Sequence, residues 1–392
     1  MNSVRSNETA RPRIGLISGE LSGIGGLEMS ALRHIRLMAD HLDIVSISLE
    51  TSKDERDWSG RVERTERNGN RFYRIFAADF RIDKVIGLTD ISKHSHLVQL
   101  EQIAREERLS ALHVFGAFHM RPFIVALAAV RLDVPLIVSF RGVDLELRIF
   151  GPNFAHLQTA LQIANQVVCV NSRAQRVVQR AFKPGGPVHV IHNHVDNNDF
   201  VNTEVRLNFP RPIIGCAGEF RRVMGLDTLL HAFTKLATDS TASLLLMGPF
   251  RPMESVYYTN LIDNFEYSQR VFRLGTISHN QILAYMNECD VLTFPSISDG
   301  SPNKVLEAML AARAVVATEV GGIPEIIRDQ VDGILVPMGD SQRLADALSA
   351  LLNDPERRRA LGENARERVL STFTPAKARA AWLECYKSAG AC

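Results

Sequence analysis

Short runs of consecutive apolar residues alternate along the chain with longer stretches in which apolar positions recur at helical spacing. In the first half these runs predict strands at residues 13–18, 43–49, 111–117, 135–140 and 166–171. The runs are rich in valine and isoleucine and do not alternate with polar residues, which is typical of parallel strands that helices cover on both faces. A stretch with helical periodicity at 27–40 follows the first run and a glycine-rich turn.

The pattern stops and restarts near the middle of the chain. Residues 196–212 are polar and turn-rich, and we interpret them as a linker. Beyond them a helix is predicted at 226–237, and strands are predicted at 212–218, 243–248, 270–275, 289–295 and 314–320. Two consecutive βαβ series of similar size predict an α/β protein with two doubly wound, Rossmann-like domains that face each other across a cleft. We expect domains at residues 1–198 and 199–374, followed by a C-terminal helix at 375–392.

Composition and charge exclude several classes of protein. With 392 residues, of which 45% are apolar and 23% charged, the chain is long enough for two or three globular domains. A formal net charge of +1 gives no electrostatic case for a nucleic-acid partner. The five cysteines form no Cys-x-x-Cys pair, which favours reduced, mostly buried thiols over a disulfide framework or a zinc site.

Hydropathy bears on where the protein works. The segment MNSVRSNETARPR at the start is polar and lacks the apolar core of a signal peptide. No uninterrupted apolar run reaches the roughly 18 residues that span a bilayer. We therefore expect a cytoplasmic protein, with peripheral contact at the inner face of the membrane as an open alternative.

The most informative stretch is SISDGSPNKVLEAMLA at residues 296–311. The apolar run VLTFP leads into Asp299 and Gly300, and a helical run that carries Glu307 follows. Ser301 is a favourable N-cap, and Pro302 suits the first helical position, whose amide has no internal partner. The sequence therefore predicts a helix that begins directly after a strand, at a turn bearing a carboxylate.

Such a helix start predicts an anion site. The amides of Asn303, Lys304 and Val305 would point out of the first turn, and the helix dipole would add to their attraction for phosphate. Gly300 would let a ligand approach the backbone closely. The carboxylates on either side would lie about 10 Å apart, which is long for the paired acids of a glycoside hydrolase. The spacing suits acids that hold hydroxyl groups on both sides of a phosphate, as in a sugar joined through a diphosphate to a ribose.

A longer segment carries a family resemblance. Residues 296–340, SISDGSPNKVLEAMLAARAVVATEVGGIPEIIRDQVDGILVPMGD, resemble the donor-binding signature of family 4 retaining glycosyltransferases of the GT-B fold. Further segments support the resemblance across most of the chain: GIGGLE (23–28), SFRGVD (139–144), HNHVD (192–196), GEFRRVMGLDTLLHAF (218–233) and CDVLTFPS (289–296).

The resemblance implies roles for individual residues. Glu307 would hold the ribose hydroxyls of the nucleotide, and Asp299 would bind hydroxyls of the transferred sugar. The other donor-binding residues would act mainly through their backbone, on the distal phosphate, on the diphosphate or on the base. They are Gly300, Ser301, Pro302, Asn303 and Lys304 for the distal phosphate, Gly25, Gly26 and Gly218 for the diphosphate, and Thr276 and Ile277 for the base.

The sequence departs from the family pattern at three places. Asp299 stands where the family usually has Glu, and Arg141 stands where a His often lines the sugar site. Glu219 and a methionine at 224 replace the arginine and lysine that relatives place beside the diphosphate. We interpret Arg221 or Arg222 as the replacement cation, since an arginine binds phosphate in a bidentate manner.

Each assignment has a simpler alternative, in which the residue serves a turn, the surface or an ion pair. These are a turn role for Asp299, Gly25 and Gly26, a solvent-facing role for Lys304, Arg221 and Arg222, and an ion pair of Arg141 with Asp144 or Glu146. The histidines at 113, 119, 192 and 194 lack metal-ligand spacing, and the chain contains no Asp-x-Asp pair. We therefore expect neither a catalytic metal nor a cofactor.

The resemblance implies a retaining, metal-independent transferase that moves a sugar from a nucleotide diphosphate sugar to a glycan, lipid-linked or small-molecule acceptor. The second domain would bind the donor and the first the acceptor, with the C-terminal helix returning to the first domain. A nucleotide-sugar epimerase or a glycan phosphorylase is a rival within the same fold. The alternative from another class is an inactive nucleotide-sugar-binding subunit that partners an active transferase.

Overall fold

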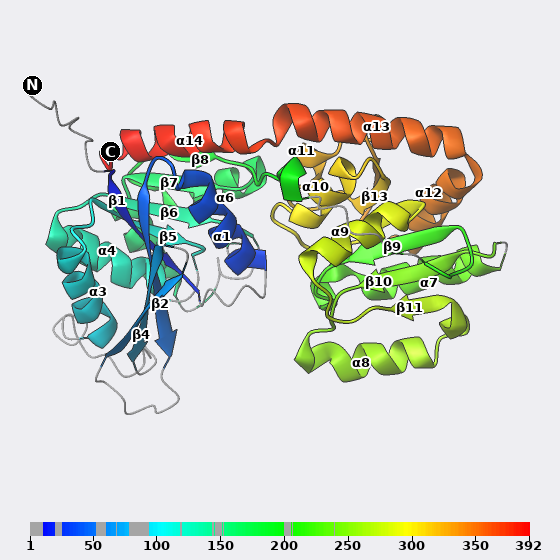
Figure 1. Ribbon diagram of the computed structural model, residues 1–392, viewed down its shortest axis with the longest axis horizontal. Helices are drawn as coiled ribbons and strands as arrows, with labels where there is room; N and C mark the ends of the chain where they lie inside the picture. The colour runs from blue at the N-terminus through cyan, green and yellow to red at the C-terminus, as the bar shows by residue number, and fades with distance from the viewer. Residues whose placement is uncertain are drawn as a thin grey trace, which may run out of the picture. The chain divides into compact units, whose positions relative to one another are not determined.

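The computed structural model describes residues 11–19, 26–51, 60–67, 69–77, 94–117, 120–142, 145, 151, 153–199, 205, 207–238 and 240–392. The chain divides into two compact units, residues 1–191 with 379–392 and residues 192–378. Each unit is built on its own sheet with helices packed against it (Figure 1). The predicted α/β class with two doubly wound sheets is confirmed.

The first unit contains an eight-stranded sheet in the order β3-β4-β2-β1-β5-β6-β7-β8. The pairing is parallel from β4 to β8, and the central strands β5 and β6 are buried along their whole length, which explains their unbroken apolar sequence. The strands are Arg13–Ser18 (β1), Asp43–Thr51 (β2), Arg61–Arg67 (β3), Asn70–Ala77 (β4), Ala111–Phe115 (β5), Leu136–Phe140 (β6), Gln166–Cys169 (β7) and Val188–Val190 (β8). The helices are Gly26–Met38 (α1), Ser95–Glu106 (α3), Arg121–Leu132 (α4), Phe154–Ile163 (α5) and Ser172–Phe182 (α6).

The edge hairpin of β3 and β4 is absent from the sequence-based prediction. These strands pair antiparallel, with Arg67 opposite Asn70 across a turn in which Gly69 has a φ of 75°. Most of β3 is exposed and polar, so it lacks the apolar run on which strand prediction relied. The Asn-Gly step at 68–69 is a strong hairpin signal and could have revealed the pair.

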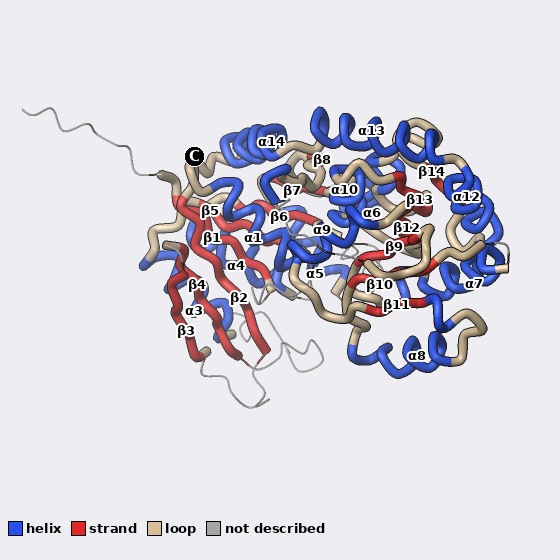
Figure 2. The backbone as a smooth tube through the Cα atoms, turned by 45° about the vertical axis from the view of Figure 1, so that its right-hand side comes forward, coloured by secondary structure: helices blue, strands red, loops and turns tan. Residues whose placement is uncertain are grey.

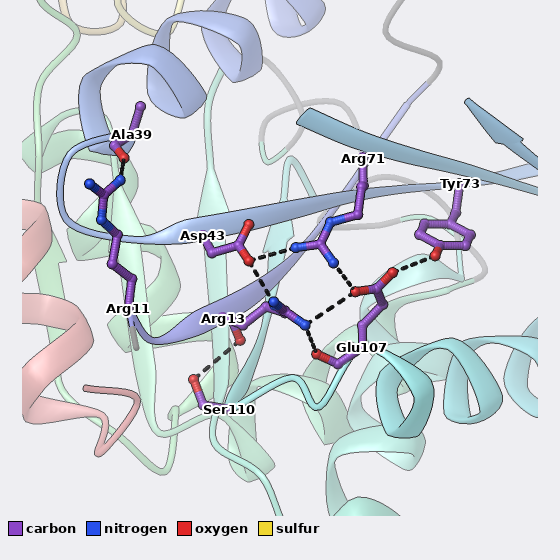
Figure 3. Close-up of polar contacts among 8 residues, drawn as sticks. All are labelled: Arg11, Arg13, Ala39, Asp43, Arg71, Tyr73, Glu107 and Ser110. Atoms are coloured by element: carbon purple, nitrogen blue, oxygen red, sulfur yellow. Dashed lines mark hydrogen bonds and ion pairs between the residues drawn. The ribbon is translucent and has the colours of Figure 1, made fainter. Parts of the chain in front are cut away.

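A network of ion pairs ties four elements of the first unit together at the amino ends of its strands (Figure 3). The Asp43 carboxylate accepts from Arg13 Nε at 2.7 Å and pairs with Arg71, which also pairs with Glu107. Tyr73 donates to Glu107, and burial together with that bond raises the pKa of Tyr73 to about 12. This edge is opposite to the carboxyl edge at which open α/β sheets bind ligands, so we regard the network as structural.

The second unit contains a six-stranded parallel sheet in the order β11-β10-β9-β12-β13-β14. Its strands are Ile213–Ala217 (β9), Ser243–Met247 (β10), Val271–Arg273 (β11), Val291–Phe294 (β12), Ala314–Thr318 (β13) and Ile334–Val336 (β14). Its helices are Leu226–Ala237 (α7), Pro252–Asp263 (α8), His279–Glu288 (α9), Asn303–Leu310 (α10), Ile323–Ile326 (α11), Ser341–Asn353 (α12) and Pro355–Thr372 (α13). The last helix, α14 (Pro375–Ser388), begins in this unit and ends in the first one.

Alternate residues of each strand feed two separate cores on the two faces of this sheet. On β9, Ile214 and Cys216 pack with α7, α8 and α12, whereas Ile213 and Ala217 pack with α9, α10 and α13. Because both faces are covered, every residue of β9, β10, β12 and β13 is buried. Figure 2 shows the sheet with helices on either side of it. This packing holds α10 against the sheet, and α10 carries the candidate site.

Candidate functional site

The strand order of the second unit defines a switch point between β9 and β12. From β9 the chain passes outward to β10 and β11 and then returns to the other side of β9 as β12. The chain leaves β9 and β12 toward opposite sides of the sheet at its carboxyl edge, which is where open α/β sheets bind ligands. The two loops contact one another, because the Ile297 amide donates to the Val223 carbonyl at 2.8 Å. The predicted donor-binding residues 218–222 and 299–307 lie on these loops and on α10.

The helix after β12 begins one residue later than predicted. Pro302 has a ψ of 116° and occupies the cap position, so Asn303 is the first residue of α10 and Ser301 does not cap it. The physical reason is an external hold on the loop: Asn193 Nδ2 donates to the Ser301 carbonyl at 2.7 Å. The Val305 amide donates to the Pro302 carbonyl at 3.2 Å, which corrects the expectation that it would face a ligand. The outward-facing amides are those of Asn303 and Lys304.

Two buried polar atoms at this helix start have no hydrogen-bond partner among the described residues. They are the Ser301 hydroxyl and the side-chain oxygen of Asn303. Ser301 is only 5% exposed, and a buried polar group without a partner typically costs about 1–3 kcal/mol. A ligand that accepts from the Ser301 hydroxyl and donates to the Asn303 side-chain oxygen would remove that cost. The feature therefore points to a polar ligand at the start of α10.

Glu307 lies one turn into the same helix and is deeply buried, with 2% of its side chain exposed. Its Oε2 accepts from Lys304 Nζ at 2.7 Å, and its Oε1 lies 3.7 Å from His279 Nε2. Lys304 Nζ is in turn 3.3 Å from His279 Nδ1. A carboxylate accepts hydrogen bonds only, so Glu307 is a group that hydroxyls of a ligand could donate to. Lys304 thus contacts Glu307 instead of serving only as a solvated surface residue.

Asp299 is half-buried at the end of the loop after β12, and its backbone is held by the turn that follows the neighbouring strand β13. The Gly322 amide donates to the Asp299 carbonyl at 3.3 Å. Gly321 has a φ of 56°, and a Cβ there would lie 1.5 Å from that carbonyl oxygen. Only glycine fits this close approach, which gives a physical reason for the Gly-Gly pair of the signature. Gly300, the next residue, is buried.

The loop after β9 carries the predicted diphosphate contacts. Gly218 has a φ of 150°, and its amide donates to Met247. The Glu219 carboxylate pairs with Arg251 Nη2 at 3.2 Å, so its charge is offset by a residue that the sequence analysis did not consider. Arg221 is half-buried, and within the described chain its guanidinium has no partner. Arg222 is exposed, and its amide donates to Glu254 at 2.7 Å.

The turn after β11 holds the residues predicted to meet the base. Thr276 is exposed, whereas Ile277 packs against the core on the α9 face. A capping box formed by Ser278 and Gln281 then starts α9. This cap places His279 on the first turn of α9, from which it reaches Glu307.

The first unit contributes the remaining predicted residues. Gly25 lies outside the described residues, and Gly26 is the first residue of α1. Arg141 directly follows β6, is 9% exposed, and donates from Nη1 to the Ile191 carbonyl at 3.2 Å. The suggested ion-pair partners of Arg141 at 144 and 146 fall outside the described residues.

Sequence reasoning missed three residues of this region. Asn193 positions the Ser301 carbonyl, His279 approaches Glu307, and Arg251 offsets Glu219. The Ser-x-x-Gln pattern at 278–281 marks a helix start and could have directed attention to His279. No sequence signal indicates the Arg251 contact, because it depends on how α8 folds back toward β9.

The described residues contain no cluster of three or more His, Cys, Asp or Glu side chains arranged to hold a metal ion. Within the same part of the chain, no helix combines the length and apolarity needed to cross a bilayer.

Two family models match the chain. Residues 24–199 match the model of Glycosyltransferase Family 4, and residues 200–368 match that of Glycosyl transferases group 1. The N-acetyl-alpha-D-glucosaminyl L-malate synthase of Bacillus anthracis is 25% identical over 71% of this chain and 74% of its own length. The alpha-maltose-1-phosphate synthase of Mycolicibacterium smegmatis is 29% identical over 60% of this chain and 66% of its own length.

Solved structures show the same fold at low sequence identity. The sucrose-phosphate synthase from Thermosynechococcus elongatus superposes with a TM-score of 0.77 at 20% identity, over 96% of this chain and 98% of its own. Anabaena HepE in complex with UDP and glucose superposes with a TM-score of 0.74 at 18% identity, over 96% and 100%. The fold, the signature on α10 and the two family models agree: the chain belongs to the family 4 glycosyltransferases, retaining enzymes of the GT-B fold.

Proposed function

We propose that this glycosyltransferase takes its sugar from a nucleoside diphosphate sugar, binds that donor mainly through the second unit, and needs no metal for transfer. The acceptor is a hydroxyl of a glycan, a lipid-linked intermediate or a small molecule, and the first unit binds it. The observation that carries the proposal is the start of α10. There a buried Ser301 hydroxyl, which has no hydrogen-bond partner in the described part of the chain, lies within two turns of a buried Glu307 carboxylate.

The chemistry of these groups matches the two halves of a nucleoside diphosphate. The Ser301 hydroxyl and the amides of Asn303 and Lys304 are donors for a phosphate, and the helix dipole adds to them. Glu307 is an acceptor for the two hydroxyls of a ribose. Asp299, on the loop before the helix, is assigned to hydroxyls of the transferred sugar. Solved structures of HepE are complexes with UDP and glucose or with UDP-glucose, which supports this donor class.

The transfer step follows from retention. The bond between the anomeric carbon and the phosphate oxygen breaks, and a bond from the acceptor oxygen forms on the same face of the sugar. The proton of the acceptor hydroxyl passes to the departing phosphate oxygen, and the nucleoside diphosphate leaves. Negative charge grows on the diphosphate during this step, so preorganised donors aimed at it lower the barrier.

Arginine supplies the cation of this step in our proposal. Glu219, which stands where relatives place an arginine, is an acid paired with Arg251 and cannot supply this cation. Arg221 is half-buried on the loop after β9, at the switch point. A bidentate arginine gives both charge and orientation to a diphosphate, which is what a metal ion supplies in other sugar transferases.

A thermal-shift screen of nucleoside diphosphates and their sugars tests the donor class. The nucleoside diphosphate that carries the correct base should stabilise the protein, by about 2.7 kcal/mol at a concentration one hundred times its dissociation constant. Glu307→Ala should remove most of that stabilisation, whereas Glu319→Ala, at an exposed position, is the matched control and should keep it. If no nucleotide raises the melting temperature, the donor proposal is wrong.

The inactive-subunit alternative is separated by turnover. Both hypotheses predict binding of a nucleotide sugar, but only the transferase releases nucleoside diphosphate when the acceptor is added. The assay adds a cell extract as a source of acceptors. If the protein binds a nucleotide sugar but releases no nucleoside diphosphate in that assay, the inactive-subunit alternative is favoured.

A further inference from the structure

A second cluster of buried polar and aromatic side chains surrounds Arg141 in the first unit. The Arg141 guanidinium carbon lies 5.1 Å from the ring centroid of Phe115 and 5.6 Å from that of Trp382. Its Nη1 also donates to the Ile191 carbonyl. The two rings and the carbonyl together hold the guanidinium group in one position and one orientation.

One of the two rings comes from the far end of the sequence. Trp382 belongs to α14, drawn in red in Figure 1, and is 2% exposed. Its indole packs edge-on against His34 of α1, with 4.7 Å between ring centroids, and lies 5.2 Å from His113 of β5. The aromatic surface around Arg141 is therefore complete only when the last helix packs on the first unit.

A chain of hydrogen bonds holds α14 in that position. The Tyr386 hydroxyl, one turn beyond Trp382, lies 2.9 Å from His34 Nε2 and 2.6 Å from His113 Nδ1. His113 Nε2 lies 3.0 Å from the Ser139 hydroxyl, which donates to the Val114 carbonyl. If Ser139 donates to the carbonyl, then His113 donates from Nε2, accepts at Nδ1 from Tyr386, and Tyr386 accepts from His34. Every hydrogen bond in the chain is then satisfied with neutral imidazoles.

Burial and the nearby charge of Arg141 support that protonation state, since they lower the pKa of His113 to about 3. Tyr386 is fully buried, and desolvation raises its pKa, so its hydroxyl keeps the proton that the chain requires. These hydrogen bonds join α14 to α1, β5 and β6 through buried side chains, and such a chain favours one arrangement of the elements it connects. The position of α14 on the first unit is thus well determined beneath Arg141.

We propose that Trp382 is a positioning residue for Arg141 and that Tyr386 locks Trp382 in place, so that the last helix completes the sugar-transfer centre contributed by the first unit. The inference rests on the proposed function and on the family resemblance, by which Arg141 stands where a His often lines the sugar site. It goes further by assigning a catalytic dependence to two residues of α14 that touch neither donor nor acceptor.

The test compares four variants for kcat, for KM, for the dissociation constant of the nucleoside diphosphate and for melting temperature. Trp382→Leu removes the ring under Arg141, and Trp382→Phe restores a ring face. Tyr386→Phe removes only the hydroxyl of the lock. Phe182→Leu is the matched control, because Phe182 is equally buried in the same unit but stacks on Phe154 instead of Arg141.

We expect Trp382→Leu to lower kcat about 10- to 30-fold, the size of a desolvated cation–π contact, with the nucleotide affinity unchanged. Trp382→Phe should recover most of the rate, and Phe182→Leu should keep it. Combined with Arg141→Lys, Trp382→Leu should add little further loss, since both changes act through one guanidinium. Equal losses in Trp382→Leu and Phe182→Leu, or losses that multiply with Arg141→Lys, would overturn the proposal.

A second readout does not depend on turnover. In protein labelled with ¹⁵N-arginine, the Arg141 Nε–H signal should show a ring-current shift and slow exchange with water. Trp382→Leu should reduce the shift to the part that Phe115 contributes and speed the exchange, and Phe182→Leu should leave both unchanged. If the wild type turns over no donor, the proposed function fails. The positioning proposal fails separately if the Arg141 signal is unshifted in the wild type, or if Trp382→Leu leaves that signal unchanged.

Discussion

Replacing Glu307 by glutamine removes one negative charge from the candidate ribose site and almost no volume. The Glu307 side chain is only 2% exposed, and its Oε2 accepts from Lys304 Nζ at 2.7 Å. A hydrogen bond to a charged group contributes about 1.5–3 kcal/mol, so the loss of charge should weaken nucleoside diphosphate binding about 10- to 150-fold. Lys304 keeps 25% of its side chain exposed and can turn to water, so the variant should fold.

Calorimetric titration of the ribonucleotide and its 2′-deoxy analogue into wild type and Glu307→Gln gives a double-mutant cycle. Wild type should bind the deoxy analogue more weakly, and Glu307→Gln should distinguish the two ligands much less. The exposed Glu319→Gln variant should behave as wild type. If Glu307→Gln lost affinity equally for both ligands without changing their ratio, the carboxylate would not hold the 2′-hydroxyl and the assignment to ribose would be refuted.

Four further predictions concern the rate, the phosphate cation, metals and pH. Asp299→Asn should lower kcat while nucleoside diphosphate affinity stays constant, and a parallel loss of affinity in calorimetry would contradict its assignment to the sugar. Arg221→Ala should lower turnover on the order of 100-fold, whereas Arg222→Ala, at an exposed position, should have a small effect; equal rates in both variants would remove the arginine clamp. Turnover should survive EDTA, and a loss that magnesium or manganese restores would refute the metal-free step. Because burial and Arg141 lower the pKa of His113 from 6.5 to about 3, the stability this residue contributes is complete above pH 6.5 and declines as the pH falls toward 3, by about 2 kcal/mol at pH 5. His113→Asn should reduce that dependence in urea unfolding followed by tryptophan fluorescence, and an unchanged pH slope would contradict the assignment.

The sequence predicted the buried strands and the site helix because both leave local signals. β9, β10, β12 and β13 are covered on two faces, so their apolar runs are unbroken. The exposed hairpin strand β3 has no such run, because one of its edges and most of its side chains meet water. Strand prediction from apolar runs therefore works at the centre of these sheets and fails at their margins.

The candidate site was predictable only in part, for a related reason. Glu307 and Ser301 belong to one short segment, so their spacing is visible in the sequence. The contacts of Asn193 with Ser301 and of Arg251 with Glu219 join residues far apart in the chain and depend on tertiary structure. The exact start of α10 was missed for the same reason, since the hold of Asn193 on the loop overrides the capping preference of Ser301.

The most direct test of the central claim follows the anomeric proton of the sugar by NMR during turnover of the nucleotide sugar that best stabilises the protein. The account predicts that nucleoside diphosphate and transferred sugar appear in equal amounts, and that the new bond has the same anomeric configuration as the donor. It also predicts that Asp299→Asn slows both signals together. Donor binding without release of nucleoside diphosphate, or a product with inverted configuration, would contradict the account.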